Sequence, residues 1–215
     1  MNRDLQRQRE FWNREIRDFD AIYSGDKGRF SSFLDSVFRW DMKARFQYTM
    51  LESDPIEGRS FLDVGCGTGK YSIALARSSA RRVVGLDISE EMVKECLRVA
   101  ALEGVGDRCE FVQTDPLAFS TDERFDVSIA IGLFDYIREP LDVLRKMREL
   151  TVQRSIFSFP RAFTWRAPVR KARLALKGCD VFFYSRGKIE RLLSEAGYRS
   201  FRIRKVGKLY CVTAE

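Results

Sequence analysis

The sequence predicts an α/β protein built on a mostly parallel, doubly wound sheet, and three features of the chain predict it. First, a short apolar strand ending in Asp63 leads into a loop with glycine at every second position. Second, an amphipathic segment follows this loop and precedes another apolar strand, which ends in Asp87. Third, strand and helix patterns continue to alternate downstream. Further strands are expected at 111–115, 125–132, 154–160, 199–206 and 208–213.

The glycine loop, Gly65-Cys66-Gly67-Thr68-Gly69, can hold a small molecule against bare backbone, because glycine lacks a Cβ and accepts positive φ. Asp87 follows at about the distance where a carboxylate can accept two ribose hydroxyls. The spacing differs from the dinucleotide fingerprint G-x-G-x-x-G, and Asp63 would repel a pyrophosphate but suit a cationic amino group. Lys70 is not placed as the lysine of a P-loop. The loop therefore indicates a nucleoside ligand with a positively charged group.

These motifs resemble those of the class I S-adenosylmethionine-dependent methyltransferases, and the match continues in order over about residues 58–215. Asp115 ends the strand whose acid usually faces the adenine amino group in this family, and Gly132 opens the turn that borders the methyl group. The resemblance implies a Rossmann-like, seven-stranded sheet with an antiparallel last strand, and S-adenosyl-L-methionine as cofactor. It implies cofactor contacts from Asp63, Gly65, Cys66, Gly67, Gly69, Asp87, Ile88, Asp115, Pro116, Ile131 and Gly132.

Residues 1–57 precede this domain and are expected to form helices. Apolar residues recur at helical spacing before and after a Ser24-Gly-Asp-Lys-Gly break. In related methyltransferases such a front segment often folds over the cofactor, so we expect an N-terminal helical lid rather than an independent domain. Tyr23 and Arg45 are its candidate contacts to the cofactor carboxylate or to the substrate.

The positive charge of the chain is concentrated in its C-terminal third. Residues 1–57 have a net charge of −1, residues 58–144 of −5 and residues 145–215 of +13. Part of this charge lies in an insert at about 161–183, which is long for a plain connection and follows the carboxyl end of a strand. Either a solvated surface or attraction of an anionic partner explains it. The candidate substrate contacts are Arg161, Arg166, Arg170 and Tyr184, with aromatic packing as the alternative for Tyr184.

The candidate catalytic residues are Asp135 and Tyr136. A neutral hydroxyl acceptor needs a base, commonly histidine or a metal, yet the chain has no histidine. An ionised acid needs none, so we expect a small acidic acceptor, a carboxylate methylated on oxygen. Asp135 could be a base, an ammonium anchor or a helix cap, and Tyr136 could contact substrate or pack. The turn after Gly132, the end of the 154–160 strand and Phe183-Tyr-Ser also resemble magnesium-protoporphyrin O-methyltransferases and related small-molecule enzymes.

Three alternatives remain open at this stage. A nucleic-acid methyltransferase would use the basic third against phosphates, but no D/N-P-P-Y-type motif follows the fourth expected strand. A lipid-surface enzyme could use Trp165–Lys177 as an interfacial helix. A non-catalytic cofactor-binding module that serves a partner is the third. The five scattered cysteines, with neither C-x-x-C nor histidine, predict no metal site. Without a signal-like segment or a long apolar run we expect a cytoplasmic protein; nothing indicates the oligomeric state.

Overall fold

The computed structural model describes residues 6–13, 32–162 and 179–215. Residues 6–13 form a short helix, called the N-terminal helix below. The later helices are α2 (Ser32–Ser53), α3 (Lys70–Arg77), α4 (Glu90–Leu102), α5 (Pro140–Leu150) and α7 (Arg186–Glu195), with a 3₁₀ turn at Gly106–Arg108. The strands are β1 (Ser60–Val64), β2 (Arg82–Asp87), β3 (Cys109–Gln113), β4 (Phe125–Ala130), β5 (Thr151–Pro160), β6 (Phe201–Val206) and β7 (Leu209–Ala214).

The seven strands form one sheet in the order β3-β2-β1-β4-β5-β7-β6. Strand β1 pairs in parallel with β2 on one side and with β4 on the other. Strand β7 runs antiparallel to both β5 and β6. This confirms the predicted fold class, including the antiparallel last strand. The strand order reverses between β1 and β4, and sheets of this kind bind ligands outside the carboxyl ends of the strands at that point.

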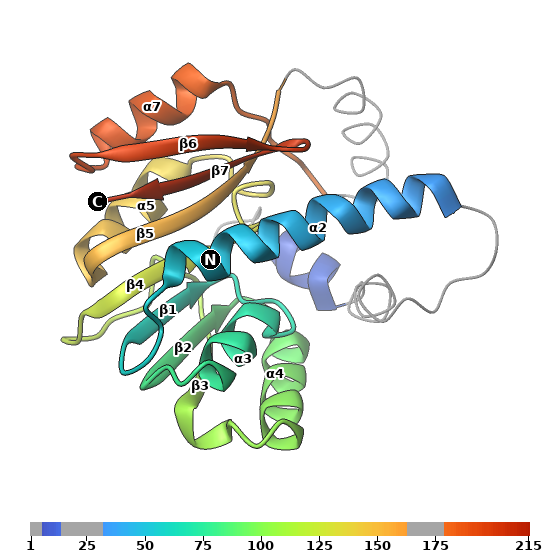
Figure 1. Ribbon diagram of the computed structural model, residues 1–215, viewed down its shortest axis with the longest axis vertical. Helices are drawn as coiled ribbons and strands as arrows, with labels where there is room; N and C mark the ends of the chain where they lie inside the picture. The colour runs from blue at the N-terminus through green and yellow to red at the C-terminus, as the bar shows by residue number, and fades with distance from the viewer. Residues whose placement is uncertain (1–5, 14–31, 163–178) are drawn as a thin grey trace.

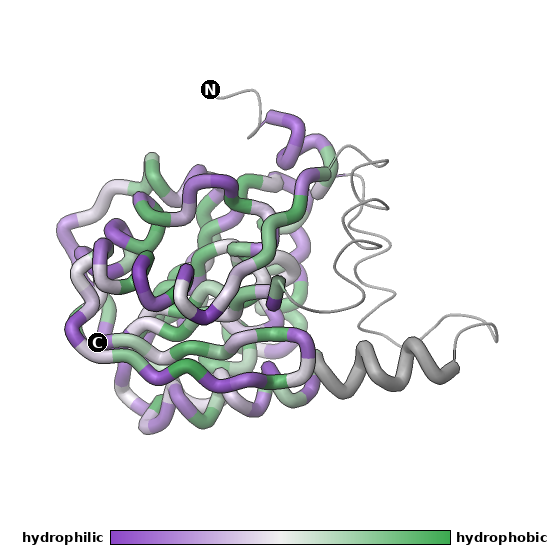
Figure 2. The backbone as a smooth tube through the Cα atoms, turned by 90° about the horizontal axis from the view of Figure 1, so that it is seen from above, coloured by the Kyte–Doolittle hydropathy of each residue, from purple (hydrophilic) through white to green (hydrophobic). Residues whose placement is uncertain are grey.

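Helices cover both faces of the sheet (Figure 1). On one face α5 and α7 contribute Leu144 and Leu193 to a core that includes Leu62 and Val64 of β1. On the other face α2, α3 and α4 pack over Phe61 and its neighbours. Figure 2 shows the hydrophobic stretches of backbone concentrated inside and the hydrophilic ones at the periphery. Alternate residues of β1 thus serve opposite cores, and each fully buried large apolar side chain contributes roughly 1.5–3 kcal/mol.

Local sequence signals set the ends of several helices. The hydroxyl of Ser89 accepts the Met92 N–H at 3.2 Å and caps α4, as predicted. Ser185 caps α7 in the same way through the Lys188 N–H. Pro140 occupies the first turn of α5, where its missing N–H has no helical partner to lose. Strand β5 begins at Thr151, three residues before the expected start, because α5 ends at Leu150 and passes directly into it.

The C-terminal half of α2 packs on β5, β6 and β7 rather than standing apart from the domain. Thr213 Oγ1 donates to the Glu52 carboxylate at 3.0 Å, so the Tyr48 hydroxyl is the donor to Thr213 at 2.8 Å. Glu52 also forms an ion pair with Arg202 of β6. Burial raises the pKa of Tyr48 to about 12, which keeps it a donor. The N-terminal lid over residues 1–57 stays a prediction. Among the described residues no helix is long and apolar enough to cross a membrane.

Candidate cofactor and acceptor site

The candidate site lies at the carboxyl ends of β1, β2 and β4. In the sheet register Asp63 of β1 faces Gly85 of β2 on one side and Ile129 of β4 on the other. Asp87 ends β2. The loop from Gly65 to Gly69 leaves β1 between these neighbours and leads into α3. The topology therefore brings the two strand-end acids and the glycine loop together, as the sequence predicts.

Two glycines of the loop are required by the packing around them. Gly65 has a φ of 73°, and a Cβ there would lie 2.8 Å from Cδ1 of Leu133 in the turn after β4. Gly69 has a φ of 79° at the start of α3, and a Cβ there would lie 3.0 Å from the Cys96 sulfur. Both positions combine a left-handed backbone with close neighbours. The loop backbone consequently stays bare at the sheet edge, as a close-fitting ligand requires.

Asp63 is 1 % exposed and accepts a hydrogen bond of 2.6 Å from the Ser72 hydroxyl of α3. Burial raises the pKa of Asp63 to about 7 against the effect of this hydrogen bond, and the nearby Asp87 raises it further. A buried carboxyl with so high a pKa gains strongly from a cationic partner. This fits the predicted contact with an ammonium group.

Asp87 shapes the loop through backbone hydrogen bonds. Its Oδ2 accepts the Gly67 N–H at 2.9 Å, and its Oδ1 accepts the Ser89 N–H at 2.9 Å. Burial raises the pKa of Asp87 to about 6 in spite of these donors. A carboxylate has acceptor capacity for about four hydrogen bonds, so both oxygens can accept a further donor. The predicted bidentate contact with ribose hydroxyls is compatible with this arrangement.

The remaining predicted cofactor residues border the same edge. Asp115 follows β3 by two residues and its Oδ1 accepts the Leu117 N–H at 3.0 Å. Ile88 follows Asp87 directly, and both Pro116 and Ile131 are buried. The Gly132 N–H donates to the Ser158 hydroxyl at 2.8 Å. A Cβ on Gly132 would lie 3.3 Å from Nη1 of Arg45, so α2 brings that guanidinium to the end of β4.

Cys66 belongs to the glycine loop, and Cys96 of α4 packs against it. Their sulfurs are 3.9 Å apart, and the Cys96 thiol donates to the Gly67 carbonyl at 3.0 Å. The neighbouring Cys96 and burial both raise the pKa of the Cys66 thiol. Cys66 therefore supports the loop as a neutral, buried side chain.

The turn after β4 contains the two candidate catalytic residues. Asp135 is buried, and its carbonyl accepts the Phe182 N–H at 2.8 Å. Tyr136 is half-buried, with Trp12 of the N-terminal helix edge-on to its ring at 4.9 Å between centroids. The Tyr136 carbonyl accepts Gln8 Nε2 at 2.6 Å. The turn is thus held by the N-terminal helix on one side and by the end of the insert on the other.

The structure describes the surroundings of two of the predicted substrate contacts, Arg161 and Tyr184. Tyr184 is fully buried, its ring packs on Phe159 and its hydroxyl donates to the Ile137 carbonyl at 3.3 Å, which is the packing alternative. Arg161 donates to the Gly207 carbonyl at 2.8 Å and lies over the Tyr210 ring, so it anchors the β6–β7 turn. Their surroundings argue against substrate contact for either side chain. Tyr23, Arg166 and Arg170 lie outside the described residues.

Sequence reasoning missed three residues at this edge: Gln8, Asn13 and Ser72. Asn13 accepts a hydrogen bond of 2.6 Å from the Ser89 hydroxyl. Asn13 and Ser89 are 76 residues apart in the sequence, and Gln8 and Tyr136 are 128 residues apart. No local sequence pattern therefore points to either contact. Ser72 could have been found, because it lies on the buried face of the amphipathic helix that follows the loop.

A groove of about 630 Å³ lies between α2, α3 and α4. The described residues that line it include Thr68 and Lys70 of the loop region but neither Asp63 nor Asp87. Lys70 lies over the Phe46 ring, and burial together with the neighbouring Arg45 lowers its pKa. The two strand-end acids and the bare glycine backbone, which the sequence predicts to bind the cofactor, lie at the strand ends and not in this groove.

Comparison with known proteins identifies the class. A family model described as a methyltransferase domain matches residues 56–181, which is more than half of the chain. The chain belongs to this family, and it is a class I S-adenosylmethionine-dependent methyltransferase. Bare glycine backbone flanked by two strand-end acids fits S-adenosylmethionine, its cofactor.

Particular relatives are more distant. The chain is 27 % identical over 143 residues to a ubiquinone biosynthesis O-methyltransferase of Neisseria meningitidis serogroup A, which covers 61 % of this chain and 60 % of that protein. It is 30 % identical over 141 residues to the protein of the same name from Aliivibrio fischeri strain MJ11, covering 58 % of each. The chain thus spans about three fifths of the length of these curated relatives.

Two solved structures share the fold over nearly the whole chain. One is magnesium protoporphyrin IX methyltransferase (ChlM) from Synechocystis PCC 6803 with bound SAH, with a TM-score of 0.78, 22 % identity and 98 % coverage of both chains. The other is the complex of DhpI with SAM and HEP, with a TM-score of 0.71, 19 % identity, and coverage of 100 % of this chain and 99 % of that one. At these identities the likeness concerns the fold.

Proposed function

We propose that this methyltransferase transfers the methyl group of S-adenosylmethionine to an oxygen of a small acidic molecule, a carboxylate. The observation that carries this proposal is the positive charge that follows β5 at the carboxyl edge of the sheet. The net charge of residues 145–215 is +13, and the insert that begins at Arg161 contains Arg161, Arg166, Arg170, Lys171 and Arg173. Since Arg161 is used by the β6–β7 turn, the other four, outside the described residues, are the candidates for binding the acid.

The chain's own residues divide the work of cofactor binding. Asp63 neutralises the ammonium group, Asp87 accepts the ribose hydroxyls and Asp115 faces the adenine amino group. Arg45, which α2 brings to Gly132, binds the cofactor carboxylate in this proposal. The sulfonium supplies a methyl group on a good leaving group. The protein then needs mainly to position the acceptor oxygen in line and to exclude water.

The acceptor side requires no dedicated base under this proposal. The chain has no histidine, and Asp135 is buried. A carboxylate is ionised at neutral pH without assistance. Arginine side chains hold a carboxylate bidentately, so part of the insert can fix one end of the acid while an oxygen faces the methyl group.

The test is a panel of carboxylic acids, phosphonates, phenols, amines and RNA, assayed with methyl-labelled cofactor. We expect turnover on a carboxylic acid and a product whose label is released by mild alkali, as from a methyl ester. The double variant Arg166→Ala, Arg170→Ala should raise the KM for the acid at least tenfold, because each charge-assisted bidentate contact contributes about 1.5–3 kcal/mol.

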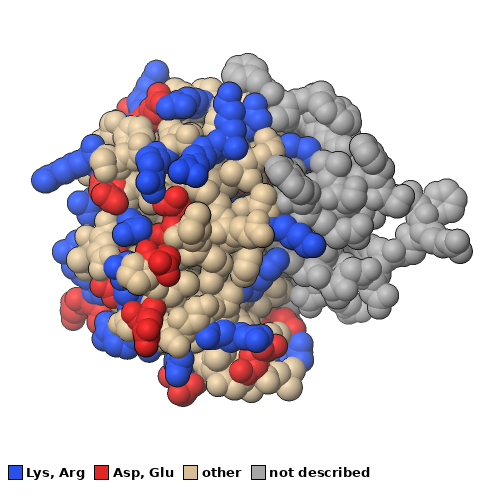
Figure 3. All heavy atoms as spheres, in the orientation of Figure 1, with Lys and Arg blue, Asp and Glu red and all other residues tan. Residues whose placement is uncertain are grey.

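A second double variant, Arg191→Ala, Arg204→Ala, is the matched control. It removes the same charge from exposed positions on α7 and β6, a region where Figure 3 shows many basic side chains. The control should keep the parent KM. Turnover restricted to amines or RNA would contradict the proposal, and so would an unchanged KM in the insert variant. An equal loss in both double variants would point to a general electrostatic effect of the surface instead.

A further inference from the structure

The N-terminal helix bridges the two sides of the glycine loop. At one end of this helix Asn13 accepts the Ser89 hydroxyl, which follows β2, at 2.6 Å. Near the other end Gln8 donates to the Tyr136 carbonyl, which follows β4, at 2.6 Å. Strands β2 and β4 are the two neighbours of β1 in the sheet. The helix therefore spans the strand that leads into the loop.

On the β2 side, Ser89 connects this helix to the acid predicted to bind ribose. Ser89 is fully buried, and its N–H donates to Asp87 Oδ1 at 2.9 Å. Its hydroxyl accepts the Met92 N–H and donates to Asn13. The N–H, the carbonyl and the hydroxyl of Ser89 are all engaged in hydrogen bonds, so this one residue connects Asp87 to Asn13.

On the β4 side, the helix closes on the acceptor turn. Trp12 packs edge-on against Tyr136, and Phe11 is buried against Cys179 and Val181 at the end of the insert. The Phe182 N–H binds the Asp135 carbonyl in the same region. One short helix thus contacts the surroundings of the ribose acid and of both candidate catalytic residues.

We propose that Asn13 is a positioning residue that couples cofactor binding at Asp87 to closure of the N-terminal helix on the Asp135–Tyr136 turn. The inference rests on the placement of the ribose at Asp87 in the proposed function. Cofactor that orders Asp87 and Ser89 favours the Asn13 contact, and by linkage the closed helix slows cofactor release. The acceptor side is then complete only after the cofactor has bound.

The experiment measures closure directly through Trp12. Replacing the other two tryptophans, Trp40→Phe and Trp165→Phe, leaves Trp12 as the only indole in the chain. Addition of S-adenosylhomocysteine should change Trp12 emission and slow amide exchange in residues 6–13. In this background Asn13→Ala should lose most of both responses and raise the dissociation rate of S-adenosylhomocysteine about fivefold, the effect of one neutral hydrogen bond.

Two further variants separate coupling from general damage to the helix. Gln6→Ala removes an exposed side chain of the same helix, whose amide donates to Glu10, and should behave as the parent. Asn13→Asp keeps an acceptor oxygen for Ser89 and should restore the Trp12 response. Equal behaviour of Asn13→Ala and Gln6→Ala, or no emission change when calorimetry shows binding, would overturn the coupling. If instead Asp87→Ala binds as tightly as the parent, the ribose placement fails by itself.

Discussion

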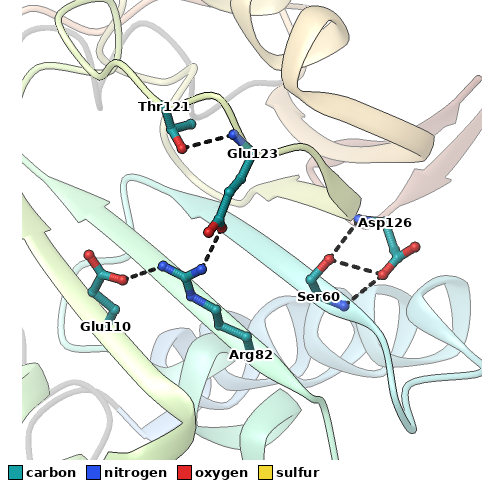
Figure 4. Close-up of polar contacts among 6 residues, drawn as sticks. All are labelled: Ser60, Arg82, Glu110, Thr121, Glu123 and Asp126. Carbon is teal, nitrogen blue, oxygen red and sulfur yellow. Dashed lines mark hydrogen bonds and ion pairs between the residues drawn. The ribbon is translucent and has the colours of Figure 1, made fainter.

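Asp126 lies at the amino ends of the strands and Asp87 at their carboxyl ends, here called the amino edge and the carboxyl edge of the sheet. The pKa values of these two acids are shifted in opposite directions. At the amino edge partial burial opposes ionisation of Asp126, yet hydrogen bonds from Ser60 together with Arg81 and Arg59 lower its pKa. Arg82 bridges Glu123 and Glu110 beside it (Figure 4). At the carboxyl edge burial raises the pKa of Asp87 to about 6 and that of Asp63 to about 7.

The difference shows which edge is built for a ligand. The acids of the amino edge are satisfied by groups of the protein itself, so they stabilise the fold and need nothing else. Asp63 and Asp87 have neutral hydrogen-bond donors, but no compensating cation lowers their pKa values among the described residues. Acids whose pKa values are raised by burial without a cationic partner are typical of functional sites.

The largest expected effect is the loss of cofactor affinity in Asp87→Ala. Two hydrogen bonds to a charged acceptor contribute about 1.5–3 kcal/mol each, and Gly67 and Ser89 lose their anchor as well. We expect calorimetric titration with S-adenosylhomocysteine to show at least 100-fold weaker binding. Asp126→Ala at the amino edge is the control and should retain the parent affinity in spite of some loss of stability. Equal losses in the two variants would remove the distinction between the edges.

Asp63→Asn sharpens the comparison through pH. In the folded protein the pKa of Asp63 is about 7, above the ordinary value of 3.8, so from about pH 4 to 7 the folded state holds a proton that the unfolded state has released. The contribution of Asp63 to stability is therefore largest below pH 4 and is lost as pH rises through 7. At pH 8 the cofactor-free variant should be more stable than the parent, by up to about 4 kcal/mol.

The same substitution should weaken cofactor binding, because a neutral amide cannot compensate an ammonium group. In the parent, affinity should fall as pH drops below 7 and Asp63 becomes protonated; in the variant this dependence should be flatter. Denaturation in urea at pH 5 and pH 8 measures the stability of parent and variant. Calorimetric titration at the same two pH values measures their cofactor affinity and its pH dependence. A variant less stable than the parent at pH 8 would show that the Asp63 carboxylate is already compensated.

The smallest expected effect separates backbone strain from crowding in the loop. Gly65→Ala meets Leu133 at 2.8 Å, whereas Gly58→Ala has nothing within 4 Å, and both glycines have a φ of 73°. Gly58→Ala should cost about 1 kcal/mol of unfolding free energy from the left-handed backbone, and Gly65→Ala about 2–3 kcal/mol because overpacking is added. Thermal unfolding measures the difference. Equal costs would show that Leu133 moves aside freely.

The sequence predicts those parts of the site that local signals determine. Asp63, Asp87 and the glycine loop follow from a strand, a turn and the next strand, so their meeting at one sheet edge needs only parallel pairing. Arg161 could not be placed from sequence, because its guanidinium depends on the Gly207 carbonyl and the Tyr210 ring, both distant in the chain. The sequence could not decide between substrate contact and packing for Tyr184 for the same reason, because the Ile137 carbonyl that accepts its hydroxyl hydrogen bond belongs to another turn.

The hydrogen bond between Tyr48 and Thr213 joins residues 165 positions apart, and it has a consequence for how the chain folds during synthesis. Strand β7 leaves the ribosome after every other strand, yet it separates β5 from β6 in the sheet and receives α2 on its surface. Forming contacts at such separations requires closing a long loop of chain first. The contacts of α2 with β7, including the Tyr48–Thr213 hydrogen bond, can therefore form only after the last of the described strands has left the ribosome, although the glycine loop is synthesised much earlier.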